Sequence, residues 1–510
     1  MTRQWIQAGW GLLLLVMVAG CESSGTKDEP RDDAGPAVED AGSGEDAGPG
    51  TDDGGSDAGV EPLACEKQQG VCAGARRAWV DGAYEPECTA RSYGADYEAA
   101  ETRCDGLDND CDGVTDPPSW SRVTSLETAY GRFSSLKTDS GVFVSIGDGN
   151  RVLILRLSSE LSIQGTASVS MPWIRTGATE GSLLTAKLLR MGDRLALHYS
   201  TTSRSSDAPL RAYLVPLDNQ GAPIPEPEEG LVEHLLFDRP LERGGTQVAA
   251  SSMGDRLLVT WNSGTERSPP RQVMGMVTDA QGQVVTAPKV LFSSATDSVP
   301  YSSNALWLRN GEVLAVIRDE KSHGFSFTVR LRRFDANLDP VDGERSFDTT
   351  NEPIPRLVDL GATRGGPLES PVLVMRASSA PDWINKLQVV QNLFNGGQPE
   401  TWAEAPTNEI LWYSALADEG VLRLGWLSVF KDHQAPPPGG DDWLGWNGRL
   451  WTLDEGQAAV DRSPDSEALP LHRYAQWVLL EKLEPRRMGA LYMTTTPDGS
   501  SLDAVRYCTP

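Results

Sequence analysis

From Trp120 onward, apolar residues recur at every second position in short runs that are separated by Gly, Asp and Asn. Such alternation is typical of strands with one buried face, and the residues between the runs are typical of turns. No amphipathic stretch of about twelve residues or more predicts a helix. The sequence therefore predicts a mainly β fold for residues 119–510.

A repeat is superimposed on this alternation. Four segments align without gaps: "SGVFVSI", "DRLALHY", "DRLLVTW" and "GEVLAVI", and weaker copies are "SPVLVM", "GVLRLGW" and "GALYM". The first apolar positions of the four are Val142, Leu195, Leu257 and Val313. Two further apolar residues follow each at intervals of two, so the three lie on one face of a strand.

A second element follows each aligned strand and ends in an Asp-containing turn. Its copies are "YLVPLDNQG", "GMVTDAQG" and "RLRRFDANLD", and we expect degraded copies in "WTLDEGQ" and "MTTTPDG". A period of roughly 50–60 residues, repeated about seven times, fits the four-stranded blades of a β-propeller. Six or eight blades stay open. Tandem immunoglobulin-like sandwiches would need about 100 residues each. We expect residues 121–130 to add a strand to the last blade and close the ring.

The N-terminus carries the pattern of an export signal. Arg3 precedes the apolar run "LLLLVMVA", which is too short to span a membrane but fits a signal peptide. The run ends in "VAGC", which resembles a bacterial lipobox. We expect residues 1–20 to be removed and Cys21 to be lipidated, with palmitate-type acyl chains that anchor the protein to a membrane. The alternative is an ordinary secretory signal with a chance cysteine.

Residues 21–62 form an acidic tether. Asp-Ala-Gly occurs four times in this segment, and its thirteen acidic residues are balanced by only two basic ones, Lys27 and Arg31. With almost no large apolar residue, the segment cannot offset its ordering entropy, so we expect disorder. The net charge of the whole chain is −27, which argues against nucleic acid as a partner.

Six cysteines remain once Cys21 is set aside, and an even number in an exported chain implies disulfides. They are Cys65, Cys72, Cys88, Cys104, Cys111 and Cys508. Five lie close together and the sixth is almost the last residue. If all six pair, one cysteine of the small module at residues 63–118 joins Cys508 and ties the end of the chain to its start. The sequence does not choose among the fifteen possible connectivities.

The segment "DNDCDGVTD" in this module has the spacing of a calcium loop. Carboxylates at its first, third and fifth positions converge when the backbone curls, and a glycine at the sixth permits the turn. The candidate ligands are Asp108, Asp110, Asp112, the carbonyl of Val114, and Asp116. Pro117 and Pro118 exclude the second helix of an EF-hand. We expect calcium, because all candidate ligands are hard oxygens, with another divalent metal as a further possibility. The alternative is a disulfide-closed turn whose aspartates cap backbone amides.

The longer motif "CDGLDNDCDGVTD" resembles the C-D-G-x-D-N-D-C-D-G motif of the MopE-like metal-binding family of bacterial exported and surface proteins. The segments "QQGVCAG" and "YEAAETRCDG" are similar to those that accompany it. The resemblance covers about 50 residues and implies a metal-binding, exported protein. We also expect a place in the cell envelope of a Gram-negative bacterium, lipid-anchored at the outer membrane on its periplasmic face or at the cell surface. The family name suggests copper, but the module contains no histidine.

Enzyme signatures such as H-E-x-x-H, G-x-S-x-G and a Walker loop are missing, and the five histidines are scattered. His198 alternates with apolar residues, which favours a packed residue over a ligand. One insertion, "DHQAPPPGGDDWLGW", offers Asp441, Asp442, Trp443 and Trp446 as a ligand-binding loop. The alternative is that its tryptophans only pin the loop to the blade.

These observations favour a monomeric, lipid-anchored binding or adhesion module that displays its propeller to a protein or glycan ligand. The alternative is a secreted propeller-type hydrolase that acts on polysaccharide. Convergent acids with an arginine or histidine at the centre of one propeller face would favour the enzyme.

Overall fold

A sheet-rich architecture follows the predicted alternation. The computed structural model describes residues 62–126, 129–148, 150–172, 182–202, 209–225, 231–240, 248–265, 268–294, 298–321, 327–349, 354–358, 371–379, 384–405, 408–418, 420–430, 446–463, 469–471, 478–496 and 499–509. The signal segment, Cys21 and the tether lie outside them, apart from Pro62. Among the described residues, no helix is long and apolar enough to cross a membrane.

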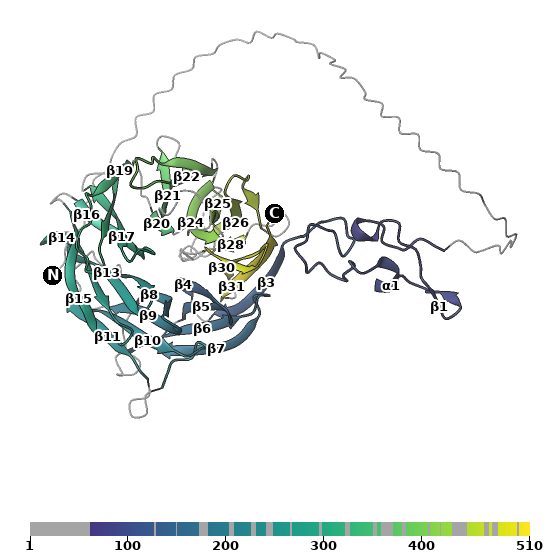
Figure 1. Cartoon of the computed structure of the whole chain (residues 1–510), viewed down its shortest axis with the longest axis horizontal. Coiled ribbons are helices and arrows are strands. Elements are labelled where there is room, and N and C mark those ends of the chain that lie inside the picture. The colour runs from purple at the N-terminus through teal and green to yellow at the C-terminus, as the bar shows by residue number, and fades with distance from the viewer. Residues whose placement is uncertain are drawn as a thin grey trace, which may run out of the picture. The chain divides into compact units, whose positions relative to one another are not determined.

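Antiparallel strands form seven successive blades around a ring (Figure 1). Blade 1 contains β4 (Ala129–Thr138), β5 (Gly141–Asp148), β6 (Arg151–Leu157) and β7 (Ile163–Ser170). Blade 2 contains β8 (Ser182–Met191), β9 (Arg194–Thr202), β10 (Pro209–Leu217) and β11 (His234–Pro240). Blade 3 contains β12 (Val248–Met253), β13 (Arg256–Thr265), β14 (Ser268–Thr278) and β15 (Val284–Ser293). Blade 4 contains β16 (Ser298–Trp307), β17 (Val313–Lys321), β18 (Phe327–Phe334) and β19 (Arg345–Thr349).

The remaining blades complete the ring. Blade 5 contains β20 (Ile354–Val358), β21 (Val372–Ser379), β22 (Ile384–Val390) and β23 (Glu400–Ala405). Blade 6 contains β24 (Asn408–Asp418), β25 (Val421–Phe430), β26 (Trp446–Asp454) and β27 (Val460–Asp461), and β28 (Leu469–Leu471) links it to the next sheet. Blade 7 contains β29 (Val478–Glu484), β30 (Arg487–Thr496), β31 (Gly499–Cys508) and β3 (Ser119–Leu126). The prediction of a mainly β, seven-bladed propeller is confirmed.

The first and last parts of the propeller meet in blade 7. Strand β3 pairs antiparallel with β31, with Ser119 opposite Arg506 and Leu126 opposite Ser500. The chain start thus supplies the outer strand of a blade whose other strands come from the chain end. The expected closure is confirmed, and we call this β3–β31 ladder the seam.

The core is divided among the blade interfaces. In the described residues, one apolar cluster fills each of the seven interfaces between neighbouring blades. The aligned repeat positions Val142, Leu195, Leu257 and Val313 are all buried. The periodic pattern therefore marks residues that hold blades together, and burial of this apolar surface is the main force that stabilises the ring.

The innermost strands form a continuous circle. Each of β4, β8, β12, β16, β20, β24 and β29 contacts the next, and β29 contacts β4. Polar side chains reinforce five of these contacts: Ser134 Oγ accepts from Leu188 N (2.8 Å), Lys187 Nζ donates to Ala250 O (2.7 Å), Trp307 Nε1 to Ser251 O (3.2 Å), Leu480 N to Ser414 Oγ (3.2 Å) and Lys137 Nζ to Leu483 O (3.0 Å). Tyr413 OH on β24 donates instead to Val374 O on β21, the second strand of blade 5, at 2.8 Å.

The Asp-containing turns follow the third strand of their blades. Asp218, Asp279 and Asp335 each accept, through Oδ1, the backbone N–H groups two and four residues ahead. Ser158 makes the same turn in blade 1 with its hydroxyl, which the sequence pattern did not reveal. "WTLDEGQ" lies at the equivalent place between β26 and β27. "MTTTPDG" does not, because it joins β30 to β31, so the prediction of a degraded copy there is wrong.

The Cys-rich module has little regular structure. It contains the 3-10 helix η1 (Gly70–Cys72), the hairpin of β1 (Trp79–Val80) and β2 (Ala83–Tyr84), and the one-turn helix α1 (Ala90–Tyr93). Disulfides join Cys65 to Cys88 and Cys72 to Cys111, and both pack with Tyr93 in a small core. The third disulfide joins Cys104 to Cys508. All six cysteines pair, and the predicted link between the module and the chain end is confirmed.

Candidate functional site

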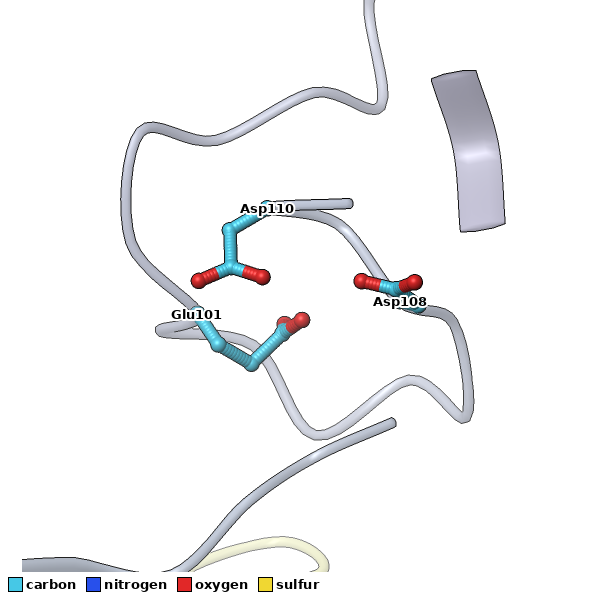
Figure 2. Close-up of side chains that lie close together, drawn as sticks. All are labelled: Glu101, Asp108 and Asp110. Carbon is cyan, nitrogen blue, oxygen red and sulfur yellow. The ribbon is translucent and has the colours of Figure 1, made fainter. Parts of the chain in front are cut away.

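Three carboxylates converge in the module. One oxygen from each of Glu101, Asp108 and Asp110 lies within 4.8 Å of the others. Figure 2 shows the three side chains pointing toward one another, Glu101 from one loop and the two aspartates from another. Asp108 is buried, and the other two side chains are partly buried. We call these three residues the acidic cluster.

Local geometry folds the aspartate loop around this cluster. Asp108 accepts the backbone N–H groups of Asp112 (3.1 Å) and Gly113 (3.0 Å) through its two carboxylate oxygens. Gly113 has a φ of 94°, and a Cβ there would lie 2.0 Å from Gln69 Oε1. The loop thus needs glycine at its sixth position, as the calcium-loop spacing predicts. The Cys72–Cys111 disulfide fixes the same loop to η1.

The surroundings of the acidic cluster raise the pKa of one member, Glu101. Burial raises the pKa of the Glu101 carboxyl, against a hydrogen bond from Asn109 N that lowers it. The negative charges of Asp116 and Asp110 raise that pKa further. A bound cation would remove this repulsion, because an opposite charge within a few ångströms favours the ionised form.

The donor set fits a hard cation. Glu101 Oε1 and Asp116 Oδ1 are buried and have no hydrogen-bond partner among the described residues. Buried polar atoms normally have a partner, and a hard cation would provide one for these two carboxylate oxygens. Calcium takes six to eight oxygens, which carboxylates and water supply together.

The structure brings together only part of the predicted ligand set. Asp108 and Asp110 belong to the acidic cluster, whereas Asp112, Val114 and Asp116 are not among its members in the described chain. Asp112 and Asp116 instead accept loop amides, from Val114 N at 2.8 Å and from Gly106 N at 3.0 Å. The capped, disulfide-closed turn that the sequence offered as an alternative therefore coexists with the acidic cluster.

Glu101 is the member that sequence reasoning missed. It lies seven residues before the loop, in "AETRC", where a single glutamate has no distinctive spacing. Its position depends on the fold, because Asn109 N donates to Glu101 Oε2 at 2.8 Å and holds the two loops together.

The innermost strands carry basic residues and one acid with a raised pKa. Lys137, Lys187 and Arg356 lie on β4, β8 and β20, and Glu481 lies on β29 near Lys137. Burial raises the pKa of the Glu481 carboxyl to about 7, although Ser135 and Lys137 both lower it. The convergent acids expected of an enzyme centre are not found around Glu481 in the described residues.

Two further sequence candidates have different outcomes. His198 is fully buried, so it is a packed residue, as the alternation favoured. Asp441, Asp442 and Trp443 of the insertion lie outside the described residues. Trp446 begins β26, but its side chain is likewise outside the description.

Comparisons with known proteins give structural neighbours only. A Trypanosoma rangeli sialidase is 11% identical, with a TM-score of 0.39, 76% of this chain covered and 59% of the sialidase covered. For a Penicillium chrysogenum α-L-arabinanase these values are 9%, 0.41, 76% and 97%. For the phage phi92 endosialidase they are 9%, 0.42, 78% and 70%. The chain thus spans less than two thirds of the sialidase.

Neither activity nor substrate transfers from likeness at this level. No protein-family model matches the chain, and no curated protein matches it. The resemblance to the MopE-like family therefore rests on the motif alone. The class of protein is defined by the fold, as a seven-bladed β-propeller with a disulfide-linked, carboxylate-bearing module at its N-terminal side.

Proposed function

We propose that this chain is an exported β-propeller protein whose Cys-rich module binds a divalent cation, with calcium as the first candidate. The carrying observation is the acidic cluster, three carboxylates within 4.8 Å of one another. The buried, unpartnered oxygens of Glu101 and Asp116 support the proposal. Two disulfides within the module give the cluster a rigid frame, which lowers the cost of organising the site.

The rest of the proposal concerns the cellular location of the protein and its binding partner. Lipidation at Cys21 would anchor the chain to the envelope of a Gram-negative bacterium, and residues 21–62 would hold the propeller away from the membrane. The propeller would then recognise a protein or, as we favour, a polysaccharide. Support comes from the lipobox and the acidic tether in the sequence.

Calcium titration of the full exported domain tests the cation site. We expect one bound ion by elemental analysis and a thermal midpoint that falls when EDTA is added. Glu101→Gln and Asp108→Asn should each weaken binding by about ten-fold or more, because each removes a charged ligand. The control is Asp81→Asn, since Asp81 is exposed in the β1–β2 turn. A metal-free protein with a chelator-insensitive midpoint would contradict the proposal.

Hydrolysis of polysaccharide is the second candidate function, and Glu481 is the observation that favours it. A carboxyl with a pKa near 7 suits a general acid at neutral pH. Glycoside hydrolysis needs a second carboxylate roughly 5 to 9.5 Å away. No other carboxylate contributes to the raised pKa of Glu481 among the described residues.

Release of reducing ends from acidic and neutral polysaccharides tests this second candidate. A hydrolase would lose at least a hundred-fold in rate on Glu481→Gln, the range expected for removal of a general acid. Glu484→Gln on the same strand, whose side chain is exposed, should leave the rate unchanged. Binding without any product would instead support recognition alone.

A further inference from the structure

The disulfides of the described chain differ in their exposure. The Cys72–Cys111 disulfide joins two buried residues, and the Cys65–Cys88 disulfide has one buried residue. In the Cys104–Cys508 disulfide both residues are partly exposed. Thiol–disulfide exchange requires a thiolate to reach one of the two sulfurs, so access selects among disulfides. The bond between the module and the chain end is therefore the most open of these to attack.

An arginine lies beside this bond. Arg486 is the second residue of the two-residue turn between β29 and β30. Its Nε donates to the carbonyl of Thr509 at 3.4 Å, and its own carbonyl accepts Thr509 N at 2.8 Å. A Cβ on Gly106 would lie 4.0 Å from Arg486 Nη2. Thr509 follows Cys508, and Gly106 comes two residues after Cys104. The guanidinium therefore lies next to both chain segments that the disulfide joins.

The backbone of Arg486 has a conformation that arginine rarely adopts. Its φ is 62°, in the left-handed region where glycine or asparagine is usual in a tight turn. Such strained residues cluster where a side chain has a function. The side chain is exposed and makes no ion pair among the described residues, whereas the next residue, Arg487, pairs with Glu160 at 2.9 Å. Asp105, the acid nearest in sequence to the bond, already pairs with Arg103 at 3.7 Å. The positive charge of Arg486 is thus available to a thiolate.

The Cys65–Cys88 disulfide has a carboxylate beside it instead. Cys88 N donates to Glu66 Oε2 at 3.2 Å, although Arg77 pairs with Glu66 at 2.6 Å and balances part of its charge. A negative neighbour disfavours a thiolate and a positive neighbour favours it. Exposure and charge therefore both select the Cys104–Cys508 disulfide.

We propose that the Cys104–Cys508 disulfide is a thiol-exchange site for an external dithiol, and that Arg486 stabilises the thiolate formed when the bond opens. A thiolate of the dithiol attacks one sulfur, and the electron pair of the S–S bond leaves on the other, which becomes a thiolate beside Arg486. The second sulfur of the dithiol then displaces the first. The dithiol is oxidised by two electrons to a disulfide, and its two protons pass to the thiols of Cys104 and Cys508.

Exchange at this site changes how the ring is closed and leaves the module intact. Cys65–Cys88 and Cys72–Cys111 still hold the small core of the module. The seam then depends on the pairing of β3 with β31. A protein that presents two neighbouring cysteines, as dithiol oxidoreductases do, fits this chemistry. The inference is independent of the cation site and of the ligand of the propeller.

The first test exposes the folded protein to dithiothreitol, alkylates free thiols at successive times, and quantifies each cysteine by mass spectrometry. We expect Cys104 and Cys508 to be alkylated together, about ten-fold or more faster than the other two pairs, because access limits attack. Opening of Cys65–Cys88 or Cys72–Cys111 at an equal or greater rate would overturn the inference.

Variants at Arg486 test the role of its charge. Arg486→Met should slow opening of Cys104–Cys508 by about three-fold or more, since the leaving thiolate loses its positive neighbour, and Arg486→Lys should retain most of the original rate. Arg76→Met, which removes an exposed arginine elsewhere in the module, is the matched control and should leave the rate unchanged. Equal slowing in both Arg486 variants would reject a role for its charge. Faster opening in Arg486→Met would mean that the arginine shields the bond, which also contradicts the inference.

Discussion

At the residue scale, two glycines of the module differ in what an added side chain would contact. Gly70 and Gly74 both have positive φ, 53° and 77°. A Cβ on Gly70 would lie 2.2 Å from the backbone oxygen of Asp108, whereas a Cβ on Gly74 would meet nothing within 4 Å. The close approach of Gly70 to Asp108 therefore places part of the acidic cluster.

Alanine at each glycine separates backbone strain from contact. Gly74→Ala should cost only the left-handed conformation, about 1–2 kcal/mol. Gly70→Ala should cost more and should also weaken calcium binding, because relief of the clash moves Asp108. Thermal melts with and without calcium measure both effects. Equal losses in the two variants would show that the contact with Asp108 is unimportant.

Glu481 gives a pH dependence of stability. Its folded-state pKa is raised to about 7 from an ordinary value of 4.5, so the fold disfavours its ionised form. Stability should therefore fall as pH rises from about 4.5 to about 7, with the full cost present above that range. The shift corresponds to on the order of 3 kcal/mol. Glu481→Gln should raise the thermal midpoint at pH 8 by several degrees and leave it nearly unchanged at pH 4.5.

The exposed Glu484 provides the matched control for this effect. Glu484→Gln, on the same strand, should show no such difference between the two pH values. A stabilisation by Glu481→Gln that is the same at pH 4.5 and pH 8 would mean that packing, rather than charge, sets the cost of the buried carboxyl.

The spacing of the aspartate loop predicted part of the acidic cluster at the residue scale. Asp108 and Asp110 belong to the cluster, and Gly113 has the positive φ that the turn requires. Glu101 could not be predicted in this way, because only the folded chain brings it to Asn109 N and to the two aspartates. A glutamate or lysine in an ordinary strand or loop context looks like a solvated residue.

At the element scale, the turns that follow the third strand of a blade share one hydrogen-bonding pattern. Either an aspartate carboxylate or a serine hydroxyl can be the acceptor. Asp279 accepts Gln281 N at 2.9 Å and Gln283 N at 2.8 Å, and Ser158 makes the same pair of contacts in blade 1. The residue three positions on has positive φ in each case, Gly282 at 74° and Leu161 at 55°. The side-chain oxygen, rather than its charge, therefore defines the turn.

Substitution at Asp279 tests that conclusion. Asp279→Ala should destabilise the propeller by about 1–2 kcal/mol, since two backbone N–H groups lose their acceptor. Asp279→Ser should recover most of that loss, because the Ser158 turn works with a hydroxyl. Urea unfolding of the three proteins supplies the comparison. A serine variant as unstable as the alanine variant would assign the effect to charge.

Strand prediction from the sequence worked because the alternation reports burial at the blade interfaces. Val142 and Leu257 are both fully buried, and each is part of such an interface. The Ser158 turn escaped notice because the repeat was recognised by its aspartate. "MTTTPDG" was misassigned because turns after second and third strands use the same residue types.

The Cys104–Cys508 disulfide acts at the scale of the whole molecule. It joins residues 404 apart in sequence, next to the end of the seam where Ser119 lies opposite Arg506. Cross-linking so long a loop removes several kcal/mol of entropy from the unfolded chain in the loop-closure picture. It also keeps the two ends of the ring together during local opening.

Removal of this disulfide should loosen the seam selectively. The double variant Cys104→Ser and Cys508→Ser should exchange the amide hydrogens of β3 and β31 faster and lower the thermal midpoint. Cys65→Ser with Cys88→Ser, the matched control, should affect the module and leave the seam protected. Unchanged exchange at the seam in the first variant would show that strand pairing alone closes the ring.

The sequence predicted that the ring closes, but it did not predict which cysteine of the module forms the disulfide with Cys508. An odd number of module cysteines left one for Cys508, but fifteen connectivities were possible. Identification of Cys104 required the distance between the module and the end of β31, which depends on contacts remote in sequence.

The position of the Cys104–Cys508 bridge has a mechanical consequence. Without it, a pull from the N-terminal side would enter the propeller at Ser119 and unzip β3 from its single neighbour, one pair at a time. With it, the load passes through covalent bonds to Cys508 and into β31, which is held by β30 on one side and β3 on the other. Force that would otherwise separate the edge strand β3 must instead separate the central strand β31 from two neighbouring strands. A propeller that is pulled from its N-terminal side is thereby suited to bear tension.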